Sequence, residues 1–350
     1  MTPGLARAGT DMRLPDEGEP EASGDRPRPW LTCIQVEHDL RQVESGLQAL
    51  VGASDPLVDE VCGQLLRAGG KLMRPALLLL GAQFGDPARP VAIRMAVAME
   101  LMHVATLYHD DIVDLATMRR GVASANARWG NKLAAFGGAF LLSKAIETFA
   151  SAGDDVNAVV SEAVHRVWNG QMREMESVKA LDIDEARLFS VIEQKTAAFF
   201  ELPCELGALV CGATTSVRAS LAAYGRNLGV AFQLIDDVMD IATDKAEFGK
   251  EPGIDLREGV YTLPVLYTLH SGTPEGRRLR EILARPDLNG EDAQEALALV
   301  RCTGSLARTS GTATCFAQRA IVYARRLPNG DARRSLLRLA DAVVQPATGI

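Results

Sequence analysis

The sequence predicts an all-α fold, because apolar residues recur at helical spacing along nearly the whole chain from Trp30 onward. No run of alternating apolar and polar residues bounded by turns competes with this spacing, which argues against a β-sheet protein. Hydrophobic side chains make up 47% of the 350 residues, enough for a sizeable core. We find neither an internal repeat nor a linker that divides residues 30–345, so one helical bundle is expected.

The first 29 residues differ in composition from the rest of the chain. They are rich in Gly, Pro, Asp, Glu and Arg, and they show no apolar period. A segment of this kind buries too little apolar surface to offset the entropy lost on ordering. We therefore expect residues 1–29 to be a disordered leader and residues 30–350 to form a single domain. A secretory signal is not expected, since its apolar run is missing here.

Charge and cysteine usage exclude several classes of protein. The formal net charge is −8, whereas a nucleic-acid surface needs a clustered positive field, so no nucleic-acid partner is expected. The six cysteines are scattered without a C-x-x-C pair, which indicates neither a zinc site nor a disulfide framework. No uninterrupted stretch reaches the roughly 18 apolar residues of a spanning helix. These features favour a cytoplasmic protein without a transmembrane segment.

Helix boundaries can be predicted at several places. Ser54-Asp55-Pro56 combines a capping side chain with a proline at the first helical position, and Gly69-Gly70 ends the same helix. A longer apolar helix is expected from Pro90 to Asp114. Further breaks are expected at Gly130 and at Gly137-Gly138.

Acidic side chains form a stripe along the helix that ends at Asp114. Its members follow one another at helical spacing, with Asp111 beside the stripe: Glu100, His103, Asp110 and Asp114. Carboxylates at this spacing repel one another, and burying them unpaired is costly, so a bound cation would resolve the conflict. Hard oxygen ligands of this kind suit Mg²⁺. The alternative interpretation is a solvated acidic helix end.

A second acidic stripe argues for the metal. Gln233, Asp236, Asp237 and Asp240 again follow helical spacing inside an apolar frame. Two such stripes rarely arise by accident, and together they predict Mg²⁺ as cofactor. The predicted metal ligands are Asp110, Asp111, Asp114, Asp236, Asp237 and Asp240.

Cationic side chains complete the pattern at three places. Lys71 and Arg74 follow the glycine pair at a helix start, where backbone N–H groups favour an anion. Arg119-Arg120 comes shortly after the first acidic stripe, and Lys195-Thr196 lies within a later helix. Each motif alone is more often a structural or surface feature. Combined with the acids and an apolar core, they describe a site for diphosphates with hydrocarbon tails.

These motifs closely resemble those of the trans-isoprenyl diphosphate synthase (polyprenyl synthetase) family, from about residue 60 to 270. The resemblance rests on their order and spacing: Gly69-Gly70-Lys71 with Arg74-Pro75, His109 to Asp114, Arg119-Arg120-Gly121, Trp129 to Lys132, Lys195-Thr196-Ala197, Phe232 to Asp240, Gly249-Lys250, and Asp255 to Gly259. It implies a single-domain, isoprenoid-synthase-type helical bundle around a central cavity, assembled as a homodimer. It also implies a Mg²⁺-dependent prenyltransferase that joins isopentenyl diphosphate to an allylic diphosphate.

The resemblance assigns roles to individual residues. Isopentenyl diphosphate would be held by Lys71, Arg74, His103 and Arg120. The Mg²⁺-allylic diphosphate would be held by Asp110, Asp114, Arg119, Lys195, Thr196 and Gln233, with further metal on Asp236, Asp237 and Asp240. The residues expected to be catalytic are Asp110, Asp111, Asp114, Arg119, Lys195, Asp236 and Lys250, the last near the leaving group.

Some positions bear on product length or depart from the family pattern. Ala105, five residues before Asp110, is small and would leave room for a growing chain, which favours a product of C20 or longer. Tyr108 and Met102 are bulky neighbours that would restore a floor. The departures from the family pattern are Leu72, Ala139 and Val260.

Two rival functions deserve comparison. A class I terpene cyclase also ionises diphosphates with an aspartate-rich helix, but its second motif usually carries Asn, Ser and Glu, whereas the second cluster here is aspartate throughout. A non-catalytic subunit of a heteromeric synthase tends to lose aspartates, and this chain keeps both sets. Both comparisons favour the synthase.

Overall fold

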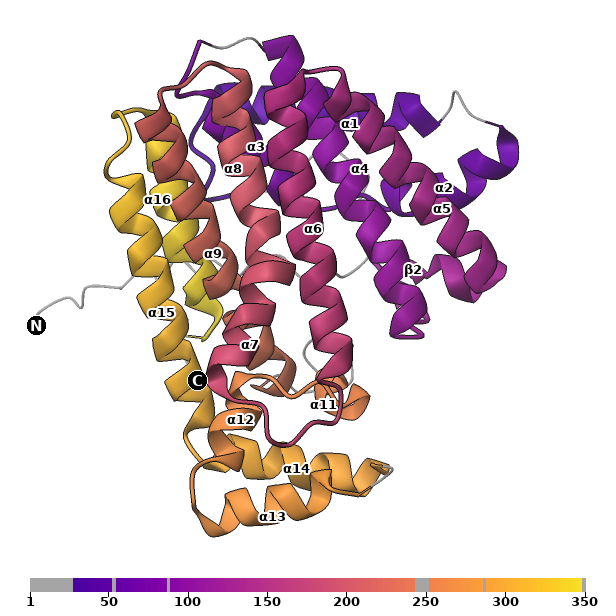
Figure 1. Cartoon of the computed structure of the whole chain (residues 1–350), viewed down its shortest axis with the longest axis vertical. Helices are drawn as coiled ribbons and strands as arrows, with labels where there is room; N and C mark the ends of the chain where they lie inside the picture. Colours follow the sequence, from indigo (N-terminus) through magenta and orange to yellow (C-terminus); the bar gives the residue numbers. More distant parts are fainter. Residues whose placement is uncertain (1–27, 52–54, 87–88, 243–251, 286–287, 348–350) are drawn as a thin grey trace, which may run out of the picture.

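The protein is a helical bundle, which confirms the all-α prediction (Figure 1). The structure, a computed structural model, describes residues 28–51, 55–86, 89–242, 252–285 and 288–347. Within these ranges the only strands are β1 (Met118–Arg119) and β2 (Val122–Ala123), which pair as a short antiparallel hairpin. The hairpin follows the helix that carries the first acidic stripe.

The helices divide into three groups along the chain. The first group comprises α1 (Ile34–Val51), α2 (Pro56–Arg67), α3 (Met73–Ala82), α4 (Arg89–Val113), α5 (Ala125–Ala150) and α6 (Asp154–Glu176). The second comprises α7 (Glu185–Ile192), the π-helix η1 (Glu193–Ala197), α8 (Ala198–Val210) and α9 (Thr215–Ala242). The third comprises α11 (Ile254–Glu258), α12 (Leu263–Leu269), α13 (Pro274–Leu283), α14 (Gly290–Cys302), α15 (Ser305–Ala324), α16 (Asp331–Val344) and the 3₁₀ turn η2 (Gln345–Ala347).

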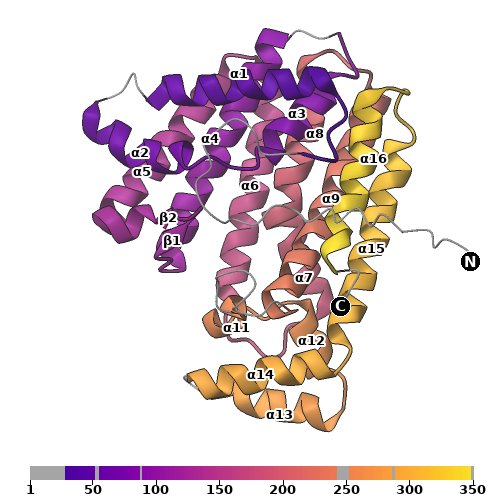
Figure 2. The ribbon, with the colours of Figure 1, turned by 180° about the vertical axis from the view of Figure 1, so that it is seen from behind.

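The order of packing places α4 and α9, the two acidic helices, within one bundle. α4 packs against α3 and α5, α3 against α8, α8 against α9, and α9 against α15. Seen from behind, α1 lies across one end of the bundle, and the α13–α14 hairpin lies at the opposite end (Figure 2). Backbones approach closely where glycines cross: a Cβ added at Gly207 of α8 would lie 1.9 Å from the Leu78 carbonyl oxygen of α3.

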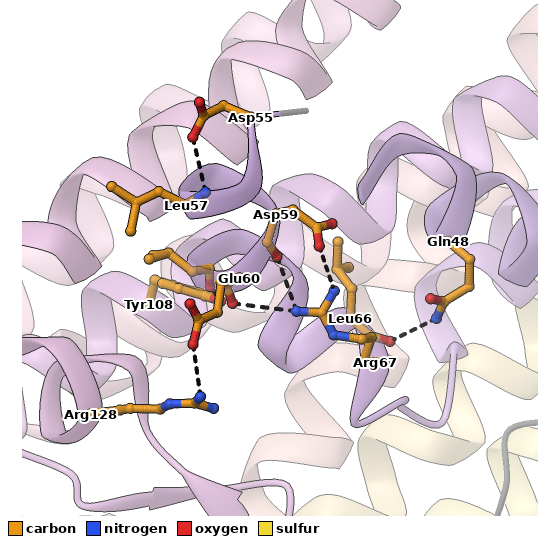
Figure 3. Close-up of polar contacts among 10 residues, drawn as sticks. Gln48, Asp55, Leu57, Asp59, Glu60, Leu66, Arg67, Tyr108 and Arg128 are labelled. Carbon is orange, nitrogen blue, oxygen red and sulfur yellow. Dashed lines mark hydrogen bonds and ion pairs between the residues drawn. The ribbon is translucent and has the colours of Figure 1, made fainter. Parts of the chain in front are cut away.

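Helix α2 confirms the predicted capping signal. Asp55 accepts a hydrogen bond from the Leu57 amide at 2.9 Å, Pro56 occupies the first turn, and Gly69 has a positive φ of 74° just beyond the helix. Figure 3 shows how neighbours hold this helix, with Arg128 of α5 paired to Glu60 at 2.9 Å. Its place is therefore fixed by polar contacts as well as by its apolar face.

Two helices are long and apolar enough to cross a membrane by length and composition alone, Pro90–Val113 and Ala125–Ala150. Charged residues such as Glu100 in the first helix and Lys132 in the second interrupt the apolar sequence, so neither helix is an uninterrupted apolar run. The apolar window of the first is 67% buried, as in the core helix of a bundle. That of α5 is only 33% buried, so one side of α5 presents apolar groups at the surface.

The N-terminal boundary differs slightly from the predicted one. Residues 1–27, most of the predicted leader, lie outside the described residues. Arg28 donates hydrogen bonds to the Lys71 carbonyl oxygen at 3.3 Å and to Glu37 at 3.2 Å. Thr32 donates its amide hydrogen to Ser335 of α16 at 2.9 Å. Arg28 therefore contacts the folded domain, although its position was predicted to belong to the leader.

Candidate functional site

The first acidic stripe lies at the end of α4, where Asp110 and Asp114 are one turn apart. Burial raises the pKa of Asp110 to about 6, Lys195 opposes this shift, and the Asp114 and Glu174 carboxylates add to it. Burial also raises the pKa of Asp114, and Lys195 again opposes that rise. These electrostatic effects mean that the ammonium group lies close to both carboxylates. The structure thus brings Asp110, Asp114 and Lys195 together, as predicted.

Asp111 points away from that pair and into the protein. Its side chain is fully buried, and one carboxylate oxygen accepts a hydrogen bond from Arg119 Nε at 2.7 Å and forms an ion pair with Arg119 Nη2 at 2.6 Å. The other oxygen, Oδ2, has no hydrogen-bond partner among the described groups. Asp111 therefore orients Arg119, and its remaining oxygen is the kind of orphaned buried acceptor that a cation would satisfy.

The β1–β2 hairpin sends its two arginines to different parts of the site. Arg120 and Gly121 both have positive φ angles, 53° and 75°, as a two-residue type I′ turn requires. While Arg119 reaches Asp111, Arg120 reaches back to the buried Glu100 of α4 at 3.1 Å. The backbone turn therefore decides which carboxylate each arginine meets.

A second cationic cluster lies around the start of α3. Arg74 donates a hydrogen bond to His103 Nε2 at 3.0 Å, because a guanidinium group can only donate. Burial, followed by the neighbouring arginines, lowers the pKa of His103 well below its usual value, so the ring is neutral. A Cβ on Gly70 would lie 2.9 Å from the Arg120 guanidinium carbon, so a larger residue there would displace that guanidinium group. Arg74, His103 and Arg120 therefore gather beside the glycine pair, as predicted.

Two neighbouring positions behave differently from this cluster. Lys71 is exposed, and its carbonyl oxygen is the group that Arg28 holds. Leu72 is buried and has a positive φ of 47° directly before α3, so its side chain packs in the core rather than facing an anion. Ala139, another departure from the family pattern, is exposed on α5.

The second acidic stripe on α9 is joined to the Lys195 helix by hydrogen bonds. Thr196 donates to Gln233 Oε1 at 2.7 Å, and Gln233 Nε2 donates to Asp237 at 2.8 Å. Burial raises the pKa of Asp237 to about 8, with the bond from Gln233 opposing and Asp236 adding to the shift. Asp237 is therefore protonated at neutral pH unless a cation is nearby.

Other carboxylates connect the two stripes. Burial and then Asp114 and Asp240 raise the pKa of Glu258 to about 6, so this carboxylate of α11 lies within range of both clusters. Glu174 of α6 raises the pKa of Asp110, Asp114 and Asp237 as well. The two stripes therefore face a common space.

The donor set fits hard divalent cations. Within the described ranges, no three His, Cys, Asp or Glu side chains are arranged to hold a metal ion by themselves. Mg²⁺ typically takes one or two carboxylates and completes its shell with water and phosphate oxygens, which this arrangement allows. Lys250, predicted near the leaving group, lies outside the described residues.

Some site residues were not predicted from the sequence. Glu174, Asp255 and Glu258 place carboxyl groups near the acidic stripes. Asp255 and Glu258 occur in a motif that was noted for its resemblance but given no role. Glu174 had no signal beyond its position one turn after Gly170.

A small chamber lies next to the acidic end of α4. Ala105 lines it, as expected, whereas Tyr108 is not among the lining residues and donates a hydrogen bond to the Val61 carbonyl oxygen of α2 at 2.5 Å. The His109 and Trp168 rings lie 5.7 Å apart at its wall. The lining residues are Met102, Ala105, Thr106, His109, Leu142, Val164, Val167, Trp168 and Phe199.

Known proteins resemble the chain over most of its length. The sequence pattern of the polyprenyl synthetase family matches residues 55–300. The chain is 35% identical over 310 residues to the nonaprenyl diphosphate synthase of Mycobacterium tuberculosis (strain ATCC 25618 / H37Rv), covering 88% of this chain and 92% of that protein. It is 34% identical over 308 residues to the octaprenyl diphosphate synthase of Escherichia coli (strain K12), covering 88% and 95%. The polyprenyl synthase of Caulobacter crescentus CB15, crystallised with calcium and isoprenyl diphosphate, superimposes with a TM-score of 0.83 at 30% identity, covering 91% and 99%.

Proposed function

Because the chain belongs to the polyprenyl synthetase family and is a prenyl-transferring diphosphate synthase, we propose that it condenses isopentenyl diphosphate with an allylic diphosphate at a Mg²⁺ site between its two aspartate stripes. The observation that carries this proposal is the position of Lys195, an ammonium group held among carboxylates next to Asp110 and Asp114. A small apolar chamber adjoins the end of α4 that carries Asp110, so the hydrocarbon tail of a diphosphate bound at the acids would start among apolar side chains.

Each substrate has its own set of residues in this proposal. Arg74 and Arg120, with neutral His103 between charged groups, bind the diphosphate of isopentenyl diphosphate, and Lys71 adds a charge from the exposed loop. Burial lowers the pKa of Arg74 to about 10, so this guanidinium stays charged at neutral pH. Lys195 and Arg119 bind the allylic diphosphate, and Thr196 and Gln233 fix the neighbouring helices.

The reaction follows from this placement. Asp110, Asp114, Asp236, Asp237 and Asp240 would hold the divalent ions, which would supply Lewis-acid stabilisation of the departing diphosphate. Asp111 keeps Arg119 aimed at the same anion. The C=C bond of isopentenyl diphosphate then attacks the allylic carbon, and the departed diphosphate accepts the proton. Lys250 is proposed to lie near that leaving group.

We propose a linear all-trans product of C20 or longer. Ala105 is small and lines the chamber, and Tyr108 bonds to α2 instead of closing the floor. Met102 and Trp168 are the bulky groups that would limit chain growth. Relatives named as nonaprenyl and octaprenyl diphosphate synthases support a long product.

We propose that the protein is a cytoplasmic homodimer. None of its six cysteines, all in the described part of the chain, forms a disulfide, which suits a reducing compartment. Leu133, Phe136 and Ile146 of α5 are 38%, 76% and 48% exposed, and neighbouring α6 exposes Met172 and Met175. A second copy placed on this side of α5 would cover them.

The experiment for this function is incubation of the purified protein with Mg²⁺, isopentenyl diphosphate and, separately, dimethylallyl, geranyl, farnesyl and geranylgeranyl diphosphates. We expect elongation in five-carbon steps to C20 or beyond, identified by mass. Absence of elongation with every primer would refute the proposal. A hydrocarbon product without isopentenyl incorporation would identify a terpene cyclase instead.

A further inference from the structure

We propose that Glu174 of α6 is a positioning residue for Lys195, holding its ammonium group clear of Asp110 and Asp114 so that these carboxylates remain available to the metal-bound diphosphate. This inference rests on the proposed function, because it assumes that Lys195 binds the allylic substrate. Lys195 Nζ donates a short hydrogen bond to Glu174 Oε2. Of the described side chains, Glu174 is the one that accepts a hydrogen bond from the Lys195 ammonium group.

The backbone is arranged to bring Glu174 to this position. Gly170, one turn before Glu174 on α6, lies directly against the π-helix η1 that carries Lys195. A Cβ at Gly170 would lie 2.5 Å from the Lys195 amide nitrogen and 2.9 Å from the Gln194 carbonyl carbon. Only glycine permits so close a crossing, and residues four apart lie on the same helix face. The close contact at Gly170 thus aims the next turn of α6 at Lys195.

The charges around Lys195 show what Glu174 opposes. Burial by itself would lower the pKa of Lys195, but Glu174, Asp110 and Asp114 raise it, and Glu174 makes the largest of these electrostatic contributions. Three carboxylates therefore compete for one ammonium group. In the structure the Lys195 ammonium group is hydrogen-bonded to Glu174, whereas Asp110 and Asp114 interact with it only through longer-range electrostatic attraction.

Loss of the Glu174 charge changes this balance. Lys195 would then move toward Asp110 and Asp114, the remaining anions within reach, and an ion pair there would compete directly with divalent cations. The isopentenyl diphosphate cluster around Arg74 would be unaffected, because no contact joins it to Glu174 among the hydrogen bonds and ion pairs described. The expected defect is therefore specific to metal and allylic diphosphate.

The test compares Glu174→Gln with Glu176→Gln. Glu176 lies on the same helix, but its carboxylate is 71% exposed and pairs with Arg187 at the surface. For Glu174→Gln we expect a rise of about tenfold in the KM for allylic diphosphate, the usual scale for one charged hydrogen bond, with the KM for isopentenyl diphosphate unchanged. The half-saturating Mg²⁺ concentration should rise in parallel. Glu176→Gln should match the wild type in all three.

A second measurement does not depend on turnover. Calorimetric titration of inorganic diphosphate into the protein in Mg²⁺ buffer should give binding about tenfold weaker for Glu174→Gln than for the wild type or Glu176→Gln. Equal rises in both KM values with a lowered Tm, or diphosphate binding unchanged from wild type, would overturn the inference. An inactive wild type would refute the proposed function, and the titration would still decide the role of Glu174.

Discussion

At the scale of single residues, the main feature of the site is a set of carboxyl groups whose pKa values are higher than those of exposed aspartates. Asp110 and Asp237 both have raised pKa values, of about 6 and 8, chiefly because they are buried. A proton and a divalent cation compete for such groups. Catalysis in this protein should therefore depend jointly on pH and on metal concentration.

We expect activity at subsaturating Mg²⁺ to fall as the pH is lowered through about 6. The raised pKa means that Asp110 is protonated below that value and ionised above it, so metal binding is lost on the acid side. More Mg²⁺ should shift the midpoint to lower pH. Initial rates between pH 5 and 8 at two Mg²⁺ concentrations measure this, and a midpoint that ignores Mg²⁺ would contradict it.

Sequence spacing predicted that Asp110 and Asp114 lie together, because helical periodicity places them on one face. It also predicted Asp111 as a metal ligand, but it did not predict that this side chain is buried and hydrogen-bonded to Arg119. Nor could it find Glu174, since that carboxylate reaches the site through the packing of α6 against η1, a contact between segments distant in sequence.

At the scale of elements, glycine residues have two structural roles that the sequence alone does not distinguish. A glycine can interrupt a helix, or it can allow two helices to pack closely. Gly130 interrupts α5 with a non-helical conformation, as expected. The predicted break at Gly137-Gly138 is wrong, because α5 runs through both residues. A Cβ at Gly137 would lie 2.9 Å from Val61, and one at Gly138 would lie 2.8 Å from His109 Nε2. These glycines permit close helix packing rather than a turn.

The crossing of α3 and α8 gives a test of this role. Gly207→Ala would place a methyl group 1.9 Å from the Leu78 carbonyl oxygen, which forces the helices apart, so we expect a loss of about 3 kcal/mol in the free energy of unfolding. Gly311→Ala on α15, where a Cβ meets nothing within 4 Å, should be neutral or stabilise by up to about 1 kcal/mol. Denaturant unfolding measures both, and equal stabilities would contradict the packing argument.

At the scale of the whole molecule, the bundle class was predictable because nearly every segment carries the same 3.6-residue period. The π-helix at Glu193–Ala197 was not, since a single extra residue in a helical turn leaves no periodic trace. The exposure of apolar residues on α5 was not predictable either. In the sequence these residues cannot be told apart from core residues, because their exposure depends on which helices pack against α5.

The exposed apolar side of α5 allows a prediction of how one substitution changes the proposed homodimer. Phe136 is 76% exposed, so Phe136→Asp removes apolar surface from the proposed dimer contact without disturbing the core. We expect the wild type to be dimeric and the variant to shift to monomer in light scattering coupled to size exclusion. Val322→Asp on α15, 50% exposed on another helix, should remain dimeric. A monomeric wild type would refute the dimer.

The bond from Arg28 to the Lys71 carbonyl oxygen has a practical consequence for anyone shortening this chain. Composition alone suggests cutting after residue 29, which would discard a guanidinium that braces the loop carrying Lys71. Cutting after residue 27 keeps that brace together with the Arg28–Glu37 ion pair. A protein that begins at residue 28 therefore keeps the hydrogen bond to the loop that carries Lys71, whereas one that begins at residue 30 loses it.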